Sequence, residues 1–308
     1  MRLSVVILNW NALEDSIRCL ERLRMWGTIQ TRTFLVDNAS ASGEADSIAS
    51  KFPDIEVIRS EENLGFSGGT NLGIVRALAA SDAPLLLLNN DVLIEENDVV
   101  QLLGRLQSTT SAGLMAPVLH HAGDPERILS AGSRNPVLHR FHTIHEPLQP
   151  NDSYRVDSVS GAAVIIRSEV FDTIGLLDES YFFATELADL CRRAAPEGFG
   201  TFIDPRAKAF HDIDRSSRLR ETLYVYYVTR NRFLFIRKFH QFSGPLLAAT
   251  WALYGFQQSF RLKRAGRHAT AQAISAGVLD GLRGRFGGQN ERVRNACRDL
   301  PNATAGRP

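Results

Sequence analysis

The sequence predicts an α/β protein built around a parallel sheet, and three observations support this fold class. Leu85-Leu86-Leu87-Leu88, directly after Pro84, form an apolar run that is typical of a strand buried on both faces. From residue 3 to residue 118, short apolar segments alternate with segments of helical periodicity, as in βαβ units. The chain has 308 residues, 44% of them hydrophobic, which is enough for a substantial core.

The first 118 residues divide into strands and helices in strict alternation. Strands are expected at Leu3–Leu8, Thr33–Val36, Ile55–Arg59, the Leu85 run and Gly113–Val118. Helices are expected at Ala12–Trp26, Glu44–Lys51, a segment reaching Ala80, and Val99–Leu106. In the first helix, Leu13, Ile17 and Leu20 recur on one face, which is the pattern of a helix packed on a sheet. Right-handed crossovers would place the carboxyl ends of the strands along one edge.

The middle of the chain is less regular. The segment His120–Val156 is expected to be a long loop or an inserted hairpin, because its periodicity fades. A strand is expected within Ser160–Arg167, a short helix from Ser168, and a helix at Glu186–Ala195 that ends at Pro196 and Gly198. Two short strands are expected near Gly200–Ile203 and Ala207–Phe210.

The last third of the chain is predicted to be helical. Helices are expected at Leu219–His240, Ser243–Lys263 and Ala269–Phe286, followed from Gly287 by a polar tail that frays. We therefore divide the chain into an α/β domain, residues 1–215, and a C-terminal helical region, residues 216–308.

Charge is distributed unevenly along the chain, although its net charge is only +1. Residues 1–204 contain 16 Lys and Arg and 28 Asp and Glu, whereas residues 205–308 contain 19 and 6. This asymmetry indicates that the C-terminal third meets an anionic partner, such as a membrane surface or a phosphorylated substrate, or that the two parts attract each other. The acidic N-terminal part argues against a nucleic-acid binder.

The sequence predicts a cytoplasmic protein, with a contact at the inner face of the cell membrane as a further option. Cys19, Cys191 and Cys297 form neither a disulfide framework nor a paired metal-binding spacing, which is typical of a reducing compartment. The apolar N-terminal stretch is too short for a signal peptide. No run approaches the 18 apolar residues expected of a spanning helix.

Polar patches lie where the predicted strands end. They are Asn9–Asn11, Asp37–Ser40, Asn63–Asn71 and Asn89–Asp91. In an open α/β sheet these patches converge on one edge, which is where such sheets bind ligands. A lone Asp after a strand is more often a cap or turn residue, so the triplet Asn89–Asp91 is informative only together with the other patches.

The segment Asn63–Gly73 is rich in glycine, but it is not a dinucleotide fingerprint or a P-loop. Gly65, Gly68 and Gly69 lack the required spacing, and no P-loop Lys follows. Glycines here would let the backbone approach a nucleotide closely, or would simply form a turn that caps a helix. On the residues alone, the turn is the favoured interpretation.

The order of these motifs resembles family 2 glycosyltransferases, specifically their bacterial rhamnosyltransferase-like subgroup. The resemblance rests on Val6–Asn11, Val36–Ser40, Asn63–Gly73, Leu87–Asp91, Ser160–Ala163 and Leu177–Phe182, and it spans roughly residues 3–240. It implies a GT-A fold, in which a Rossmann-like nucleotide-binding sheet merges into an acceptor half. It also implies inverting transfer of a sugar, with rhamnose as one candidate, from a dTDP- or UDP-linked donor to a glycan or lipid-linked glycan hydroxyl.

Residues of the polar patches match the donor-binding motifs of that family. Asp37 would accept a hydrogen bond from N3–H of the base. The other donor-binding residues that the resemblance implies are Asn9, Asn11, Asn38, Asn63, Gly65, Gly69, Asn71, Asn89 and Asn90. Arg230, in a further matching segment, would pair with the diphosphate or form an ion pair on a helix face.

The resemblance also implies a divalent metal, Mg²⁺ or Mn²⁺. Asp91 matches the last carboxylate of the family's metal-binding triplet, and Asn89 stands where the first Asp is usual. His211 resembles a His that can complete the metal site, although a core histidine is the competing interpretation. With one carboxylate, the protein would leave most of the coordination to the diphosphate.

The catalytic base is where this chain departs from the family pattern. Relatives have Glu-Asp at the start of an acceptor-side helix, whereas this chain has Glu186-Leu187. We predict that Glu186 is the base, with Asp189 on the same helix face as the second candidate. One alternative is a catalytically impaired protein that binds sugar nucleotides, in which the charge of Glu186 only stabilises the N-terminus of the helix. The other alternative is a nucleotidyltransferase.

The helical region contains a candidate interfacial helix. Trp251, Tyr254 and Phe260 lie close in sequence to a basic cluster, Arg261, Lys263 and Arg264. Aromatic side chains at headgroup depth and cations toward anionic lipid would suit a membrane surface. Packing against the protein itself, or a contact in a homodimer, is the competing interpretation.

Overall fold

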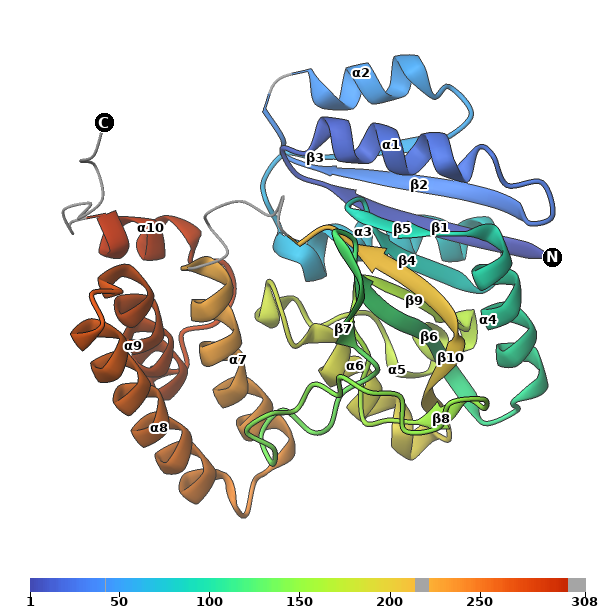
Figure 1. Ribbon diagram of the computed structural model, residues 1–308. Coiled ribbons are helices and arrows are strands. Elements are labelled where there is room, and N and C mark those ends of the chain that lie inside the picture. The colour runs from blue at the N-terminus through green and yellow to red at the C-terminus, as the bar shows by residue number, and fades with distance from the viewer. Residues whose placement is uncertain (42, 214–221, 299–308) are drawn as a thin grey trace. The chain divides into compact units, whose positions relative to one another are not determined.

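The computed structural model describes residues 1–41, 43–213 and 222–298 (Figure 1). The chain forms two compact units. The first comprises Met1–Glu179 and Glu186–Ile213, and the second comprises residues 180–185 and the chain beyond residue 213. The predicted boundary at residues 215 and 216 lies outside the described residues.

The first unit contains a mixed sheet whose first half is parallel, as predicted. Strands β1 (Arg2–Asn9), β2 (Gln30–Asn38), β3 (Glu56–Ser60) and β4 (Leu85–Asn89) lie in the order β3-β2-β1-β4. All three pairings between them are parallel (Figure 1). The strand order reverses next to β1, and such switch points are where open α/β sheets bind ligands.

The second half of the sheet is not purely parallel, which corrects the prediction. Strand β9 (Ala163–Ile166) is antiparallel to both of its neighbours, β4 and β6 (Ala112–His121). Strand β10 (Gly200–His211) is parallel to β6 and antiparallel to β5 (Val92–Ile94). The two short strands predicted near residues 200–210 are therefore one strand, with a register irregularity between Asp204 and Lys208.

Helices cover both faces of this sheet. Alternate residues of β1 face opposite cores, with Val5 and Ile7 in one and Val6 in the other. Helices α1 (Leu13–Leu23), α2 (Glu44–Lys51) and α4 (Glu96–Ser108) contribute to the first core. Helices α3 (Gly65–Ala80), α5 (Ser168–Ile174) and α6 (Glu186–Ala194) contribute to the second.

Helix α3 begins earlier than the sequence predicts, because most of the glycine-rich segment is helical. A Cβ atom on Gly69 would lie 2.6 Å from Leu8 Cδ1, and one on Gly73 would lie 2.4 Å from Val6 Cγ1. These glycines therefore allow close packing of the helix against β1. The favoured prediction, a turn that caps a helix, therefore fits only the start of the segment, because the residues from Gly65 onward are part of the helix itself.

The segment His120–Val156 contains a hairpin, as one of the two predicted options. Strand β7 (Asp124–Ser130) pairs antiparallel with β6, and the short β8 (Tyr154–Arg155) pairs with β10.

Two 3-10 helices, η1 (Glu179–Tyr181) and η2 (Ala195–Glu197), flank α6.

The second unit is helical. It contains α7 (Leu223–Phe239), α8 (Gly244–Arg264), α9 (His268–Arg283) and α10 (Asn290–Arg298). Helix α10 corrects the prediction of a fraying tail, because Val293 is buried in a core with Tyr226, Tyr227 and Ala273. Within the described ranges, none of the helices combines the length and the apolar character needed to span a bilayer.

Candidate active site

The sheet register brings three of the polar patches together at the carboxyl edge. Asn9, the last residue of β1, pairs with Asp37 on β2, and the preceding Leu8 pairs with Asn89 on β4. Side chains from these three strand ends therefore share one edge of the sheet at its switch point.

Asn9 is the central hydrogen-bonding residue of this edge. Its side chain is fully buried, and its Nδ2 donates to Asp37 Oδ1 at 2.9 Å, to Ser40 Oγ at 3.0 Å and to Glu44 Oε2 at 2.9 Å. A fully buried amide cannot contact a nucleotide directly. The structure therefore corrects the role of Asn9 from donor contact to a residue that orients Asp37.

Asn38, at the end of β2, holds the turn at Asn63 and Leu64 that leads into α3. Asn38 Nδ2 donates to Asn63 Oδ1 and to the Gly65 carbonyl, and Asn38 Oδ1 accepts from the Leu64 amide. Asn63 Oδ1 also accepts from the Gly65 amide at 2.8 Å. Asn38 is buried, so it shapes the turn, whereas the half-buried Asn63 stays within reach of a ligand at the edge.

Asn71 and Gly69 do not face a donor pocket. Asn71 is buried, and it exchanges hydrogen bonds with the backbone of Leu177, donating to the carbonyl at 2.9 Å and accepting from the amide at 3.1 Å. It also donates to Glu179 Oε1. Asn71 thus ties α3 to the segment before η1, and we withdraw both residues as donor contacts.

Asn11 and Asn90 form hydrogen bonds close to helix α1. Asn11 has a left-handed backbone with φ of 51°, and its Oδ1 accepts from the Ala41 amide at 2.7 Å. Asn90 Nδ2 donates to Ser16 Oγ, which in turn donates to Asn9 Oδ1. The sequence analysis missed Ser16, because a single Ser on the buried face of a helix carries no distinguishing pattern.

The two predicted metal ligands lie side by side. His211 Nε2 is 3.1 Å from Asp91 Oδ1, since β5, which begins directly after Asp91, pairs His211 with Val92. Asp91 Oδ1 is buried and accepts no hydrogen bond among the described residues. A buried carboxylate oxygen and an imidazole nitrogen at this distance fit a divalent cation that both groups contact.

The pair supplies only part of a coordination shell. In the described part of the chain, no group of three or more His, Cys, Asp or Glu side chains is arranged to hold a metal. Both partners are partly exposed, with side-chain exposures of 15% and 20%, so a ligand can reach them. Mg²⁺ and Mn²⁺ need more oxygen ligands than this, and a diphosphate or water would supply them.

Glu186 has the properties of a general base. It is the first residue of α6, its side chain is 6% exposed, and Oε2 accepts no hydrogen bond within the described ranges. The pKa of Glu186 is raised to about 7, mainly by burial and also by the nearby Asp189, although backbone N–H groups of Glu186 and Leu187 act in the opposite direction. A carboxyl group with a pKa near neutrality suits proton transfer at physiological pH.

Asp189 is a weaker candidate than the sequence suggests. Its side chain is fully buried, and Oδ2 accepts from Arg193 Nε at 2.7 Å. Arg193 also donates to the carbonyls of Ile174 and Leu176. Because Asp189 is fully buried and Oδ2 is bonded to Arg193, we assign Asp189 an electrostatic effect on Glu186 and correct its role as a second base.

A strained segment leads into α6, and we call residues Ser180–Thr185 the strap. Phe182, Ala184 and Thr185 have φ values of 62°, 66° and 77°, a left-handed conformation that side chains other than glycine rarely adopt. Such strain persists only where surrounding contacts fix it. The sequence gives no signal for the strap, because none of these three residues is Gly or Asn.

Helix α7 fixes the strap through two neighbouring residues. Asn231 Nδ2 donates to the carbonyls of Tyr181 at 3.1 Å, Phe183 at 2.8 Å and Ala184 at 2.6 Å. Arg230 is fully buried, and it donates to the carbonyls of Ser180 and Tyr181 and to Asn231 Oδ1. The prediction that Arg230 pairs with the diphosphate is therefore corrected, since its guanidinium is enclosed by the strap and Asn231.

Comparison with known families decides the class of protein. The profile described as "Glycosyl transferase family 2" matches residues 4–175, which is more than half of the chain. The chain belongs to glycosyltransferase family 2. It is therefore a glycosyltransferase that uses a sugar-nucleotide donor, as the resemblance implied.

Two curated members of the family give the level of similarity. The chain is 31% identical to the low-salt glycan biosynthesis hexosyltransferase Agl10 of Haloferax volcanii, over 75% of this chain and 74% of the relative. It is 24% identical to the N-acetylglucosaminyl-diphospho-decaprenol L-rhamnosyltransferase of Mycobacterium tuberculosis, over 68% of this chain and 75% of the relative.

A solved structure shows the same fold. The mannosyltransferase PcManGT from Pyrobaculum calidifontis, in complex with GDP-Man and Mn²⁺, aligns with a TM-score of 0.58 at 12% identity. The alignment covers 92% of this chain and 88% of that chain. The predicted GT-A fold with C-terminal helices is therefore confirmed.

The position at which this glycosyltransferase departs from its family is part of the core. Leu187, which stands where relatives have the Asp, is 3% exposed and belongs to the second core of the sheet. A Cβ atom on Gly161 would lie 3.0 Å from Leu187 Cδ2 and 3.3 Å from the Phe66 ring. Leu187 is aliphatic and packed in this core, so it cannot act as a base.

Proposed function

We propose that the protein is an inverting glycosyltransferase whose base is Glu186. The observation that carries this proposal is the buried carboxyl group of Glu186, with its pKa of about 7 and an oxygen that lacks a hydrogen-bond partner among the described residues. An acceptor hydroxyl would supply the missing donor to that oxygen.

The reaction forms one bond and breaks one bond. The acceptor oxygen attacks the anomeric carbon from the face opposite the leaving group, and the bond from that carbon to the diphosphate oxygen breaks. Glu186 takes the hydroxyl proton, and the nucleoside diphosphate leaves with the electron pair of the broken bond. A retained configuration would need a covalent intermediate or attack from the same face, neither of which a single general base provides.

The donor would bind along the carboxyl edge of β1, β2 and β4. Asp37 lies at this edge, and its Oδ1 is oriented by Asn9. Uracil and thymine present N3–H to a carboxylate, whereas N3 of cytosine and N1 of adenine are acceptors, so Asp37 as the partner of the base supports a UDP- or dTDP-linked sugar. The rhamnosyltransferase of Mycobacterium tuberculosis supports rhamnose as the sugar and a lipid-linked diphosphate sugar as the acceptor.

Asp91 and His211 would hold the divalent metal, Mg²⁺ or Mn²⁺. The metal, when bound, neutralises charge that builds up on the departing diphosphate. The chain's own part is to keep the carboxylate and the imidazole together at 3.1 Å, with the Asp91 oxygen buried and available.

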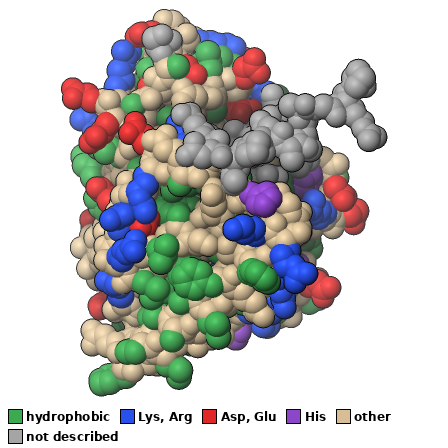
Figure 2. All heavy atoms as spheres, turned by 90° about the vertical axis from the view of Figure 1, so that its left-hand side faces the viewer, with side chains coloured by type: hydrophobic (Ala, Val, Ile, Leu, Met, Phe, Trp, Pro, Cys, Tyr) green, Lys and Arg blue, Asp and Glu red, His purple; other side chains and the backbone are tan. Residues whose placement is uncertain are grey.

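We also propose a peripheral location at the inner face of the membrane, because α8 carries an exposed apolar face. Leu246, Leu253 and Phe260 are 73%, 74% and 61% exposed, and their spacing places them on one side of the helix. Basic side chains follow at its end, and Figure 2 shows hydrophobic and basic side chains together on this side of the molecule. The same face would serve equally in a homodimer. Binding of the full-length protein to vesicles that contain anionic lipid would support membrane contact, and absence of such binding would favour the homodimer.

Calorimetric titration with UDP, dTDP and GDP, each with and without Mn²⁺, tests the proposed donor site. We expect metal-dependent binding of one pyrimidine nucleotide and at least about tenfold weaker binding of GDP. Tight binding without sugar transfer to any acceptor would favour the impaired, nucleotide-binding alternative that Leu187 raises. Release of pyrophosphate from a nucleoside triphosphate, as a sugar 1-phosphate becomes a nucleoside diphosphate sugar, would identify a nucleotidyltransferase instead.

A further inference from the structure

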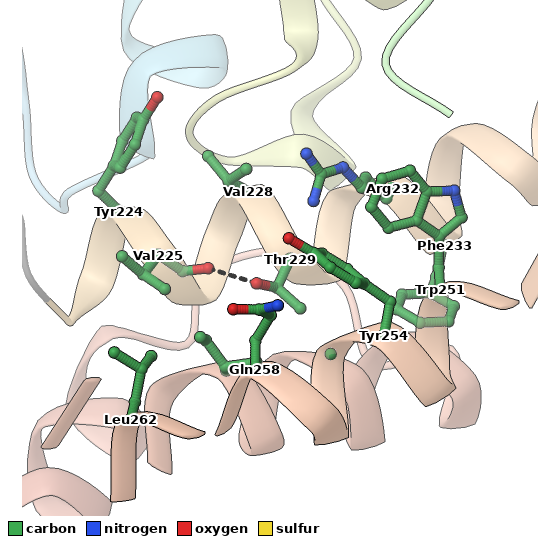
Figure 3. Close-up of a pocket in the computed structure, with 12 residues that line it drawn as sticks. Tyr224, Val225, Val228, Thr229, Arg232, Phe233, Trp251, Tyr254, Gln258 and Leu262 are labelled. Carbon is green, nitrogen blue, oxygen red and sulfur yellow. Dashed lines mark hydrogen bonds between the residues drawn. The ribbon is translucent and has the colours of Figure 1, made fainter. Parts of the chain in front are cut away.

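The helical unit contains a pocket of about 270 Å³ that is separate from the residues assigned above. It lies between α7 and α8, with Ile274 of α9 on its wall (Figure 3). Most of its lining is aliphatic or aromatic, including Val228, Phe233 and Leu262. Apolar walls with a few polar groups are typical of small-molecule sites.

Arg232 is an unpaired cation in this pocket. Its Nε is buried, and among the described residues its side chain has no hydrogen bond and no ion pair. Its guanidinium lies over the Trp251 ring, 4.1 Å from the ring centroid, as Figure 3 shows from the side. Burial lowers the pKa of Arg232 to about 10, which reflects the cost of enclosing a charge without a carboxylate.

The sequence around the pocket offers no acidic partner for Arg232. Residues 222–279 contain no Asp or Glu. Asp280, the next acidic residue, is already engaged, because it accepts from Tyr226 and pairs with Arg285 and Arg292. Neutralisation of the guanidinium therefore has to come from outside this stretch of chain.

A second donor in the pocket lacks a partner as well. Gln258 Nε2 is buried and makes no hydrogen bond within the described ranges. By contrast, the neighbouring Thr229 has a hydrogen-bond partner, because its Oγ1 donates to the Val225 carbonyl at 2.7 Å (Figure 3). Two donors without a partner, one of them charged, match a ligand that accepts hydrogen bonds and carries negative charge.

We propose that this pocket binds the phosphate group of an anionic amphiphile, with membrane lipid as the source. Phosphate oxygens would accept from Arg232 Nε and Gln258 Nε2, and the adjoining glycerol and first acyl carbons would pack on Val228, Phe233 and Leu262. A volume of about 270 Å³ suits a headgroup and not a whole lipid. The exposed apolar face of α8 would lie in the bilayer that supplies it, so the inference adds a ligand site to the proposed peripheral location.

Binding of soluble short-chain lipids to the full-length protein tests this inference without a membrane. Calorimetry would compare dihexanoylphosphatidate, dihexanoylphosphatidylcholine and inorganic phosphate, all below the concentration at which the lipids form micelles. We expect phosphatidate to bind at least about tenfold more tightly than the other two, because only it combines an accessible phosphate monoester with an apolar part.

Two variants and a matched control make the test specific for the pocket. Arg232→Gln and Gln258→Leu should each weaken phosphatidate binding, the first by at least about tenfold. Arg283→Gln, which changes an exposed arginine of the same unit, should leave binding within about twofold of the unaltered protein. Thermal melting of each variant shows whether it is folded.

Three results would overturn the inference. Equal affinity for phosphatidate and the zwitterionic phosphatidylcholine would exclude recognition of a net negative charge on the headgroup. Equal affinity for phosphatidate and inorganic phosphate would exclude an amphiphile and make free phosphate the ligand. Unchanged phosphatidate binding in the folded Gln258→Leu and Arg232→Gln variants would exclude this pocket. None of these results depends on sugar transfer, so the proposed glycosyltransferase reaction stands or falls separately.

Discussion

His211 Nε2 lies 3.1 Å from Asp91 Oδ1, although the two residues are far apart in the sequence. The short strand β5 joins them, because it leaves the carboxyl end of β4 and turns back along β10, pairing Val92 with His211. The antiparallel part of the sheet, which the sequence did not predict, is therefore what completes the candidate metal site.

Removal of the imidazole should weaken metal-dependent nucleotide binding. His211→Ala leaves Asp91 as the remaining protein ligand of the pair, so we expect the affinity for UDP or dTDP in Mn²⁺ to fall by about 10- to 100-fold. His139→Ala, a change of an exposed loop histidine, is the matched control. Calorimetry that finds the same affinity in both variants would contradict the metal role of His211.

The hydrogen bonds of Asn9 should contribute to both stability and nucleotide affinity. Asn9→Ala removes a fully buried amide and leaves Asp37 and Ser16 without their partner, which should lower the free energy of unfolding by about 1–3 kcal/mol. Urea denaturation measures this change, with Asn151→Ala in an exposed loop as the control. Nucleotide binding should weaken in parallel, and unaltered affinity would show that Asp37 needs no orientation by Asn9.

Asn231 should act on catalysis through the strap and not through donor binding. In Asn231→Ala the carbonyls of Phe183 and Ala184 lose the Asn231 donor, whereas the Tyr181 carbonyl still accepts from Arg230. The resulting displacement of the first residues of α6 should lower kcat by about 10- to 100-fold. The Kd for the nucleotide should stay within about twofold, and the pH midpoint of kcat should move as the surroundings of Glu186 change. Asn295→Ala on α10 is the control.

A purely structural role for Asn231 would give a different pattern. The variant would then melt at a lower temperature while its folded fraction retained kcat and the pH midpoint of the unaltered protein. Loss of nucleotide affinity equal to the loss of kcat would also contradict the positioning role.

Glu186 should make the protein less stable as the pH rises. Its pKa of about 7 in the folded protein lies above the ordinary value of 4.5, so the folded state holds a proton that the unfolded state has lost between these pH values. Stability therefore falls as pH increases from about 4.5 to 7, by up to about 3 kcal/mol from this group. Glu186→Gln should remove that fall.

Urea denaturation at pH 5 and pH 8 measures this effect. The variant should gain stability relative to the unaltered protein on going from pH 5 to pH 8, because other groups titrate equally in both. If the two proteins differed in free energy of unfolding by the same amount at pH 5 and at pH 8, the pKa of Glu186 would not be raised in the folded state.

The sequence was most informative where a motif coincided with a strand end. The strands at Leu3–Leu8 and Leu85–Leu88 were predictable because runs of apolar residues are typical of buried strands. The family motifs singled out Asp91 and His211, which the structure places 3.1 Å apart, and their role as metal ligands stays a prediction. The motif also led to Glu186, the first residue of α6, and its role as the base stays a prediction.

The residue roles that could not be predicted depend on whether a side chain is buried, and a sequence motif does not show this. Asn9, Asn38 and Asn71 have the composition of a ligand site, but they are buried and hydrogen-bonded to other protein groups. Gly69 and Gly73 have the composition of a phosphate loop, yet they lie in a helix where β1 leaves no room for a Cβ atom. Arg230 was mistaken for a phosphate ligand because its partners are backbone carbonyls of the strap, which leave no trace in the sequence.

The transfer rate of Glu186→Gln tests the account most directly, measured as release of nucleoside diphosphate in the presence of acceptor. The account predicts a fall in kcat of about 10²- to 10⁴-fold, with nucleotide affinity unchanged and with Glu197→Gln, an exposed control just beyond α6, fully active. In the unaltered protein kcat should rise with pH through about 7, as Glu186 loses its proton. Transfer by Glu186→Gln at the rate of the unaltered protein would contradict the assignment of the base.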